Sequence, residues 1–374
     1  MTYKLYSSNI SYFSGKMECY LHAKNIPFEI VELNSTLFRE EVIKNTQLAK
    51  MPAIECDDGT WLTDTSPMIG WFEERYPDRS ILPNDSALEF IAHLLEDYGD
   101  EWLWRPALHY RWSYAKDREL VGERIAGEML RTMKVPHVLA KAFIKRRQIQ
   151  TYVKGDGVSP ATRAHVEGTY LRTLDAMAKI LESRPFLLGD RPSLADFGFF
   201  GPMFRHFGLD PTPQRIMLER APGVFEWVAR MWNARKDTMN GDFIGEPDEA
   251  LALLLSDIGS MYMPYLKKNA VAWSKGSKTF NALIEGNLYE NLPTAQYRVY
   301  CLEQLQLRFT SLDEAAQEKV EAWLKGLDIL DVLKEPIAQA SYYDPDGLLP
   351  VCSGNDGKQE IARKARKSNV WGRS

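Results

Sequence analysis

The chain has 374 residues, of which 45% are hydrophobic, 26% charged and 11% aromatic. This length predicts two or three domains, and the composition is typical of a globular protein rather than a disordered, collagen-like or membrane protein. Lysine and arginine number 46 against 51 aspartate and glutamate residues, which gives a formal net charge of −5. Because nucleic-acid binding needs a basic surface, we expect no nucleic acid among the partners.

The four cysteines lie far apart, and the sequence contains no CxxC pair and no cysteine–histidine cluster. This spacing predicts neither a disulfide framework nor a metal site, and it fits a reducing cytoplasm. The first residues lack the basic start and apolar core of a secretory signal. The apolar stretch at residues 251–255 is too short for a membrane span of about 20 residues. We therefore expect a cytoplasmic protein with no membrane contact.

The first eighty residues begin with a strand, a helix and a second strand. Residues 3–7 are β-prone, residues 17–24 have helical spacing, and residues 28–33 (FEIVEL) form another strand pattern. A helix between two strands favours a parallel, right-handed βαβ unit.

A hairpin and a helix follow. Residues 52–62 contain two short strand patterns around Asp58 and Gly59, and an Asp-Gly pair at this place predicts a β-hairpin. Residues 65–76 have helical spacing. Residues 1–80 are therefore predicted to form a small α/β domain.

The middle of the chain predicts helices. Residues 78–85 are rich in turn formers and mark the first boundary. Apolar residues then recur at helical spacing, as in residues 166–181, which predicts an all-helical domain at residues 86–240. Ser193 predicts a helix N-cap, and Asp196 has the position of its capping-box partner.

The rest of the chain, residues 241–374, forms an extension that we expect to be mostly helical. Helical patterns cover residues 247–266 and 294–309, and Ser311 begins a Ser-x-x-Glu capping pattern for a further helix. Many aromatic residues favour packing against the helical domain over a separate small domain. Residues 358–373 contain six basic residues, which predicts a solvated basic tail.

The corner between the first strand and the first helix, residues 8–16 (SNISYFSGK), is a candidate thiol site. In a thioredoxin-like sheet, the N–H groups and dipole of the helix favour an anion such as a thiolate there. A hydroxyl donor would lower the pKa of a bound thiol from about 8.5 toward neutrality. Ser11 is our candidate donor. Alternatively, Ser11 serves only as the N-cap of the helix. The alternatives for the donor are Ser8, Ser14, Tyr6 and Tyr12.

Four segments resemble the glutathione S-transferase family. Residues 4–33 (KLYSSNISYFSGKMECYLHAKNIPFEIVEL) resemble its opening strand, its turn with a catalytic serine, tyrosine or cysteine, and its first helix. Met51-Pro52 resembles the family's cis-proline segment, in which the backbone of the preceding residue pairs with the cysteinyl part of glutathione. Residues 58–65 (DGTWLTDT) are similar to the segment that holds the γ-glutamyl group. Residues 186–196 (FLLGDRPSLAD) resemble a structural capping segment of the helical domain.

The resemblance implies a glutathione site in which Ser11 is the catalytic residue that stabilises the thiolate. Asp64 and Thr65 stand where the family usually has Glu and Ser, so the carboxylate side chain is shorter here. Both residues also suit the N-cap of the following helix, a role that is compatible with binding. The implied glutathione-binding residues are Met51, Pro52, Asp64 and Thr65, with Arg39, Lys44 or Lys50 at the glycine carboxylate.

Residues 101–112 (EWLWRPALHYRW) correspond to the helix that faces the glutathione sulfur in the family. We expect an apolar electrophile to bind against Tyr12, Trp104, His109 and Trp112. Aromatic residues at helical spacing are more often core residues, so packing is the other interpretation of this stretch. A single histidine is more typical of a structural residue than of a general base, and no metal site is predicted.

The resemblance covers about residues 3–233 and implies an α/β plus all-α fold. A thioredoxin-like N-terminal domain (βαβ-ββα) would precede an all-helical transferase C-terminal domain and the mostly helical extension. The implied function is that of a cytosolic glutathione S-transferase in detoxification, with glutathione as co-substrate and no metal. Family members are usually homodimers, so we expect a homodimer unless the extension blocks that interface.

Two other functions stay open at this point. The extension favours a non-catalytic assembly or binding module with a transferase-like fold. A thiol reductase is disfavoured, because Ser11 stands where such enzymes have cysteine and Cys19 lies more than one turn into the helix.

Overall fold

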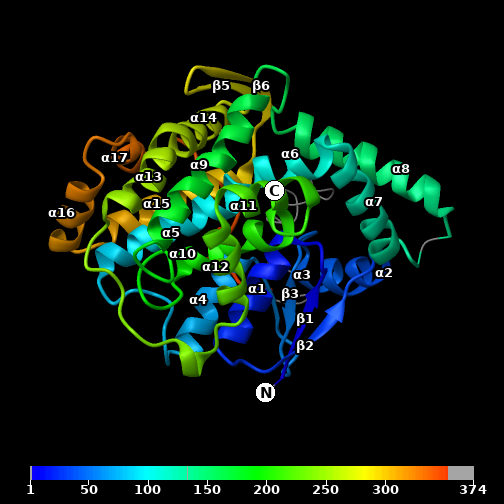
Figure 1. The fold of residues 1–374 in the computed structure, drawn as a ribbon, viewed down its shortest axis with the longest axis horizontal. Coiled ribbons are helices and arrows are strands. Elements are labelled where there is room, and N and C mark those ends of the chain that lie inside the picture. Colours follow the sequence, from blue (N-terminus) through cyan, green and yellow to red (C-terminus); the bar gives the residue numbers. More distant parts are fainter. Residues whose placement is uncertain (1, 133, 353–374) are drawn as a thin grey trace.

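The computed structural model describes residues 2–132 and 134–352, so the predicted basic tail at residues 358–373 lies outside the described residues. The first part of the chain is a mixed sheet flanked by helices, in blue at the bottom of Figure 1. Its elements in chain order are β1 (Tyr3–Ser7), α1 (Tyr12–Ala23), β2 (Phe28–Glu32), α2 (Ser35–Leu37), the π-helical η1 (Phe38–Ile43), α3 (Lys44–Thr46), β3 (Ala53–Glu55), β4 (Trp61–Thr63) and α4 (Thr65–Arg75). The predicted βαβ-ββα order is confirmed, and only the short helices between β2 and β3 were not predicted.

The sheet has the strand order β2-β1-β3-β4-β7. β1 pairs in parallel with β2, whereas the pairs β1–β3 and β3–β4 are antiparallel. The tight turn of the β3–β4 hairpin contains Gly59, whose φ of 83° is a left-handed conformation that glycine adopts without a steric penalty. The hairpin predicted from the Asp-Gly pair is therefore confirmed.

The fifth strand, β7 (Val351–Cys352), comes from the far end of the described chain and was not predicted. It pairs antiparallel with β4, with Cys352 opposite Trp61. The N–H of Thr63 also donates to the carbonyl of Pro350 at 3.0 Å. The extension thus covers an edge of β4 that would otherwise present unpaired backbone groups.

The second part of the chain is helical, as predicted. Its described residues form isolated β-bridges but no strand. Its elements are α5 (Ser86–Glu101), α6 (Trp104–Ser113), α7 (Ala115–Met129), α8 (His137–Gln148), the π-helical η2 (Ile149–Lys154), α9 (Arg163–Leu181), α10 (Leu194–Pro202), the π-helical η3 (Met203–Phe207), α11 (Pro211–Arg220), α12 (Pro222–Trp232) and the 3-10 helix η4 (Lys236–Thr238). The predicted capping box at the start of α10 is confirmed, because Ser193 and Asp196 cap each other. Asp196 also accepts from the indole N–H of Trp227 at 3.1 Å, which ties α12 to α10.

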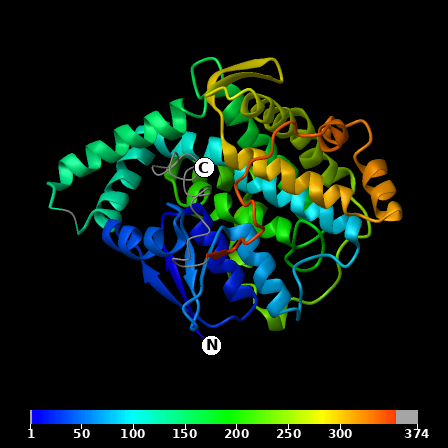
Figure 2. The same cartoon turned by 180° about the vertical axis from the view of Figure 1, so that it is seen from behind.

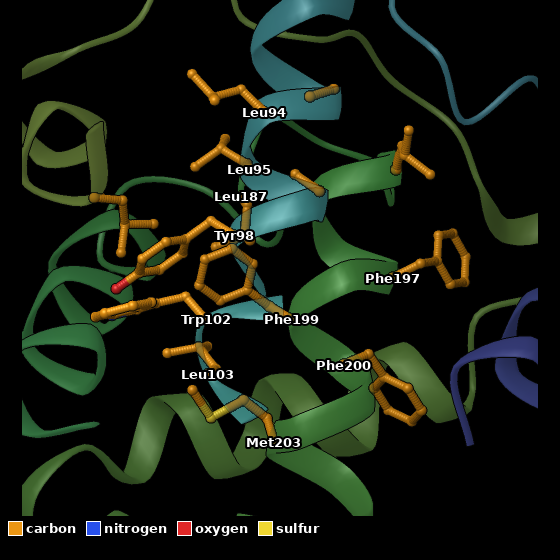
Figure 3. Packing of buried hydrophobic residues seen from close by; sticks show 14 of the residues in the cluster. Leu94, Leu95, Tyr98, Trp102, Leu103, Leu187, Phe197, Phe199, Phe200 and Met203 are labelled. Atoms are coloured by element: carbon orange, nitrogen blue, oxygen red, sulfur yellow. The ribbon is translucent and has the colours of Figure 1, made fainter. Parts of the chain in front are cut away.

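The core is centred on the contact between α5 and α10, where large buried side chains such as Tyr98, Trp102 and Phe199 pack together (Figure 3). A Cβ on Gly198 would lie 2.6 Å from the Cα of Glu96, and a Cβ on Gly99 would lie 2.9 Å from the carbonyl carbon of Gly198. Both distances are far below van der Waals contact, so the two backbones approach this closely only because neither position has a side chain. Tyr98 and Phe199 pack beside the contact with ring centroids 6.0 Å apart.

Apart from β7, the extension is helical with one hairpin. Its elements are α13 (Glu249–Asp257), the π-helical η5 (Ile258–Tyr262), α14 (Met263–Ser274), β5 (Thr279–Ile284), β6 (Asn287–Pro293), α15 (Gln296–Thr310), α16 (Glu314–Trp323) and α17 (Ile329–Lys334). The β5–β6 hairpin was not predicted, although Gly286 with a φ of 76° marks its turn. The predicted cap at Ser311 is wrong, because the N-cap of α16 is Asp313, which accepts from the N–H of Ala316 at 2.8 Å.

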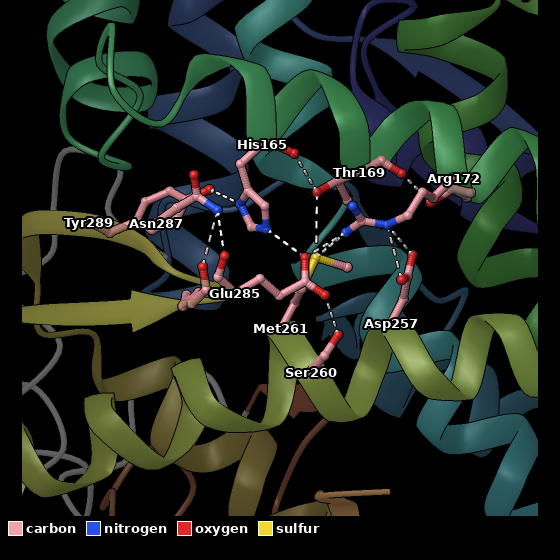
Figure 4. Close-up of polar contacts among 11 residues, drawn as sticks. His165, Thr169, Arg172, Asp257, Ser260, Met261, Glu285, Asn287 and Tyr289 are labelled. Carbon is pink, nitrogen blue, oxygen red and sulfur yellow. Dashed lines mark hydrogen bonds and ion pairs between the residues drawn. The ribbon is translucent and has the colours of Figure 1, made fainter.

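The hairpin is tied to α9 by a polar network (Figure 4). His165 contacts the hydroxyl of Tyr289 through Nδ1 at 2.7 Å and the carboxylate of Glu285 through Nε2 at 2.9 Å. Arg172 reaches both Glu285 and Asp257, each at 3.1 Å. These contacts place the extension against the helical domain and not apart from it.

We predict that Gly198→Ala destabilises the protein by about 1–3 kcal/mol, because the added methyl group overlaps the backbone of α5. Gly127→Ala is the matched control: Gly127 lies in α7, and a Cβ there would meet nothing within 4 Å. This control should be neutral or stabilising by up to about 1 kcal/mol, since alanine is the better helix former. Chemical denaturation of both variants measures the two changes, and equal stabilities would contradict the glycine contact.

Candidate functional site

Ser11 lies at the start of α1, at the corner where a thiol site was predicted. It is the N-cap residue of α1, and its Oγ accepts from the N–H of Ser14 at 3.3 Å. The Ser11 residue is half-buried, whereas Ser8 and Ser14 are buried at 4% and 0% exposure. The Oγ of Ser14 in turn accepts from the N–H of Ser8 at 3.3 Å. Of the three serines, Ser11 is therefore the one that a ligand at the helix N-terminus can reach.

The two tyrosine alternatives have other hydrogen-bond partners. The hydroxyl of Tyr6 donates to Glu55 at 2.9 Å, and the hydroxyl of Tyr12 donates to the carbonyl of Gly99. Burial, followed by the hydrogen bond to Glu55, raises the pKa of Tyr6 above its ordinary range. Both hydroxyls thus have structural roles in this conformation.

The peptide bond between Met51 and Pro52 is cis, as the family resemblance implies. Pro52 is buried, and Met51 packs against a small cluster that includes Tyr6 and Trp61. This segment leads directly into β3, so the backbone of Met51 lies at the same end of the sheet as the start of α1.

Asp64 lies between β4 and α4 with a φ of 72°, an uncommon conformation for a residue other than glycine. Its side chain is almost completely buried, with 7% of the residue exposed. Oδ2 accepts from Nζ of Lys50 at 3.3 Å. Thr65, the first residue of α4, is also buried. Lys50 and Asp64, two residues that the resemblance assigns to opposite ends of glutathione, are thus paired with each other.

Two tyrosines of the extension complete the surroundings of Asp64. Tyr297, in the first turn of α15, donates its hydroxyl to Oδ1 of Asp64 at 3.0 Å, and Tyr343 donates to Oδ2 at 3.5 Å. Nζ of Lys50 lies 3.5 Å from the ring centroid of Tyr297 and 4.9 Å from that of Tyr343. The lysine is therefore held by a carboxylate and by two aromatic faces.

The protonation states of these groups agree with this arrangement. Burial lowers the pKa of Lys50, but the charge of Asp64 and the contact with Tyr343 outweigh burial, so the pKa lies above its ordinary value. Burial, followed by the charge of Asp64, raises the pKa of Tyr297 well above its ordinary value. At neutral pH, Lys50 is charged and Tyr297 is a hydrogen-bond donor.

The other two candidates for the glycine carboxylate lie elsewhere. The Arg39 side chain is 72% exposed and pairs with its neighbour Glu40 at 3.4 Å. Lys44 is exposed at the start of α3. Of the three basic candidates, Lys50 is the one that the structure brings to Asp64.

Aromatic side chains gather next to Ser11. The ring of Trp104 stacks on Phe13 at 5.9 Å and meets the edges of Tyr12 and Tyr152 at 5.7 and 5.5 Å. Phe13, Trp104 and Tyr152 are each partly exposed. The predicted pair Tyr12 and Trp104 thus lies together, but Tyr12 is 1% exposed and belongs to the interior, so of the two only Trp104 presents surface at the corner. Sequence reasoning missed Phe13, although it directly follows Tyr12, and Tyr152, which lies in a π-helical turn without a periodic pattern.

The other two predicted pocket residues belong to the interior of the helical domain. His109 is 1% exposed and contacts Glu167 through Nε2 and Ser113 through Nδ1, both at 2.9 Å. Burial lowers the pKa of His109. Trp112 is likewise 1% exposed. Neither side chain is available to a ligand in this conformation.

A buried ionic cluster fixes the Ser11 corner on the helical domain. Lys16 of α1 is fully buried and pairs with Glu96 and Asp100 of α5, and Ser66 of α4 also donates to Glu96. Burial lowers the pKa of Lys16, but the charges of Asp100 and Glu96 raise it by more, so Lys16 stays protonated. The cluster holds α1, and with it Ser11, in a fixed position relative to α5.

We predict that Lys16→Met lowers the free energy of unfolding by about 3–5 kcal/mol, because two carboxylates stay buried without their cation. Burial would then raise the pKa of both carboxyl groups in the folded state. Each group would bind its proton more tightly when folded, so the loss should be smallest below about pH 4 and grow as the pH rises.

Lys319→Met is the control for this prediction. Lys319 pairs with Asp85 at 2.5 Å, but its side chain is 52% exposed, so the loss should stay below about 1 kcal/mol. Urea titrations of both variants across the acidic range measure the difference. Similar losses in the two variants, or a loss at position 16 that does not depend on pH, would contradict the role of the cluster.

Comparison with known families identifies the two domains. The family model for the glutathione S-transferase N-terminal domain matches residues 5–80, and the model for the glutathione S-transferase C-terminal domain matches residues 160–230. The chain therefore contains the N-terminal and C-terminal domains of the glutathione S-transferase family, as its motifs indicated. No curated protein sequence matches the chain.

Solved structures of the family resemble the chain at low identity. A glutathione S-transferase from Rhodospirillum rubrum is 18% identical, and the match covers 67% of this chain and 99% of that one with a TM-score of 0.43. A β-etherase from Sphingobium is 18% identical over 67% and 98% of the two chains, with a TM-score of 0.45. A transferase from Methylobacterium radiotolerans, in complex with glutathione sulfonate, is 18% identical over 66% and 100%, with a TM-score of 0.37.

Two further observations concern the described residues as a whole. Among them, no helix is both long and apolar enough to cross a membrane. Within the same residues, no three His, Cys, Asp or Glu side chains gather into a possible metal-binding group. The homodimer and the cytoplasmic location expected from the sequence stay predictions.

Proposed function

We propose that this protein is a glutathione transferase that activates the thiol of glutathione at Ser11 for attack on an apolar electrophile. The observation that carries the proposal is the position of Ser11, a half-buried residue, at the N-terminus of α1 in a domain of the glutathione S-transferase family. Its hydroxyl and the N–H groups of the first helical turn would stabilise a thiolate more than a thiol.

Glutathione would bind along the line from Ser11 to Asp64. Its cysteinyl backbone would pair with Met51 before the cis-proline, and its γ-glutamyl ammonium would need the carboxylate of Asp64. Lys50 would take the carboxylate of the glycine end. Because Lys50 and Asp64 pair with each other at 3.3 Å, each would exchange one partner when glutathione binds.

The electrophile would lie on the aromatic rings beside Ser11. Phe13, Trp104 and Tyr152 present partly exposed apolar surface there, which suits an apolar or aromatic substrate. The thiolate would attack the electrophilic carbon held near this surface, and proximity together with the lowered thiol pKa would supply the rate enhancement.

One observation favours a second candidate, a non-catalytic binding module. The carboxylate of Asp64 already accepts hydrogen bonds from Tyr297 and Tyr343 of the extension, so the chain itself supplies hydrogen-bond donors to Asp64 without glutathione. If the extension never leaves this place, the family's ligand site would serve as an internal contact, and the exposed surface would carry the function.

We predict that Ser11→Ala raises the pKa of the bound glutathione thiol by about 1–2 units and lowers turnover about 10- to 100-fold, because one donor to the thiolate is lost. The affinity for glutathione should change little, since the other contacts remain. The thiolate absorbance of the complex as a function of pH measures the shift, and an electrophile panel measures turnover.

Ser8→Ala is the matched control. Ser8 lies in the same loop, is only 4% exposed, and its Oγ has no hydrogen-bond partner among the described residues. This variant should keep the thiol pKa and the turnover of the parent protein. An unchanged thiol pKa in Ser11→Ala, or a shift that appears in Ser8→Ala instead, would contradict the assignment of Ser11.

A further inference from the structure

The last described part of the chain crosses the glutathione site of the first domain. Residues 341–352, which we call the strap, leave the helical extension, pass Asp64 and end as β7 on the edge of β4. Figure 2 shows this segment in orange to red, running from the extension down to the sheet. The strap thus connects the most distant described part of the sequence to residues that the family uses for its ligand.

The strap and α15 together use the hydrogen-bonding capacity of Asp64. A carboxylate offers about four acceptor positions, and three of them are already used here by the hydroxyls of Tyr297 and Tyr343 and by Nζ of Lys50. The ammonium of a γ-glutamyl group would need the same oxygen atoms. With 7% of Asp64 exposed, the ammonium cannot reach these atoms while both tyrosines stay in place.

The two tyrosines differ in how firmly they are held. Tyr297 belongs to α15, a helix that packs on α5 and carries the ion pair between Arg298 and Glu101. Tyr343 belongs to an irregular segment whose next residues, 345–348, are exposed. The least costly opening is therefore a movement of the strap with α15 unchanged.

A small set of polar contacts anchors the strap. Ser341 donates through its N–H to Glu303 at 2.6 Å, and its carbonyl accepts from Gln296 at 2.7 Å. At the other end, the carbonyl of Pro350 accepts from the N–H of Thr63 at 3.0 Å. Between these anchors, the hydroxyl of Tyr343 is the contact that directly engages the glutathione site.

We propose that the strap is an in-chain competitor of glutathione: Tyr343 closes the γ-glutamyl subsite at Asp64, and glutathione binds when Tyr343 moves away. This inference rests on the proposed function, because it presumes that glutathione is the ligand of Asp64. On binding, Asp64 exchanges the hydroxyl of Tyr343 and the ammonium of Lys50 for the ammonium of the ligand, and Lys50 exchanges Asp64 for a carboxylate of the ligand. Two charge-assisted contacts then replace one, which favours the exchange.

The closed strap has a measurable consequence for affinity. When only a fraction of the molecules is open, the apparent dissociation constant is the intrinsic one divided by that fraction. Any change that weakens the closed state without touching the ligand must therefore tighten glutathione binding. Removing the hydroxyl of Tyr343 is such a change, since the ring and its packing stay.

The test is a calorimetric titration of the full-length protein with reduced glutathione. Tyr343→Phe should lower Kd about tenfold, because one hydrogen bond to a charged group no longer holds the strap closed. Adding Tyr297→Phe should lower Kd further. Tyr300→Phe is the matched control: the ring of Tyr300 packs on Tyr297 and Tyr343 at 5.8 and 5.0 Å, but the tyrosine hydroxyls that reach Asp64 among the described residues are those of the other two.

The outcomes separate this inference from the proposed function. Suppose that the parent protein binds glutathione and that Kd is unchanged or raised in Tyr343→Phe. The proposal that the strap competes with glutathione would then be wrong, whereas the proposal that the protein binds glutathione would stand. A raised Kd would mean that the hydroxyl helps to hold the ligand. If neither the parent nor any variant binds glutathione at millimolar concentrations while all remain folded by circular dichroism, the proposed function fails and the competitor with it.

Discussion

The buried carboxylate of Asp64 is the interaction on which the rest of the arrangement depends. An ionised carboxylate away from water is stable only when it is paired and hydrogen-bonded, and Asp64 obtains its partners from three separate parts of the chain. Lys50 comes from the segment before β3, Tyr297 from α15, and Tyr343 from the strap. The need to pair this one carboxylate therefore couples the first domain to two tyrosines of the extension, 233 and 279 residues further along the chain.

A second constraint fixes the place where chemistry would occur. The glycine contact between α5 and α10 brings the helical backbones close together, and the Lys16 cluster joins α1 to α5. Ser11 at the start of α1 is thereby set beside the aromatic rings of Trp104 and Phe13. The proposed thiol site and the proposed electrophile surface are held together by this packing, while the γ-glutamyl end of the site is covered by the extension.

The sequence predicted those features that short-range patterns encode. The βαβ-ββα order, the Asp-Gly hairpin and the capping box at Ser193 each depend on residues a few positions apart. The two-residue strand β7 pairs with β4 from the far end of the described chain, and the contacts of Asp64 with Tyr297 and Tyr343 join positions 233 and 279 residues apart. Sequence periodicity does not indicate such distant pairs. His109 and Trp112 were predicted beside the ligand from the family resemblance of their helix, whereas packing turns both into the interior, as their helical spacing alone would have indicated.

The most direct test of the account is hydrogen exchange of the N–H of Thr63, which donates to Pro350 of the strap, with and without saturating glutathione. The account predicts that glutathione speeds exchange at Thr63, because the strap leaves the edge of β4, while peptides from the start of α1 exchange more slowly around the bound thiol. Slower exchange at Thr63, or no change there when the α1 peptides report binding, would contradict the claim that ligand and strap compete for Asp64.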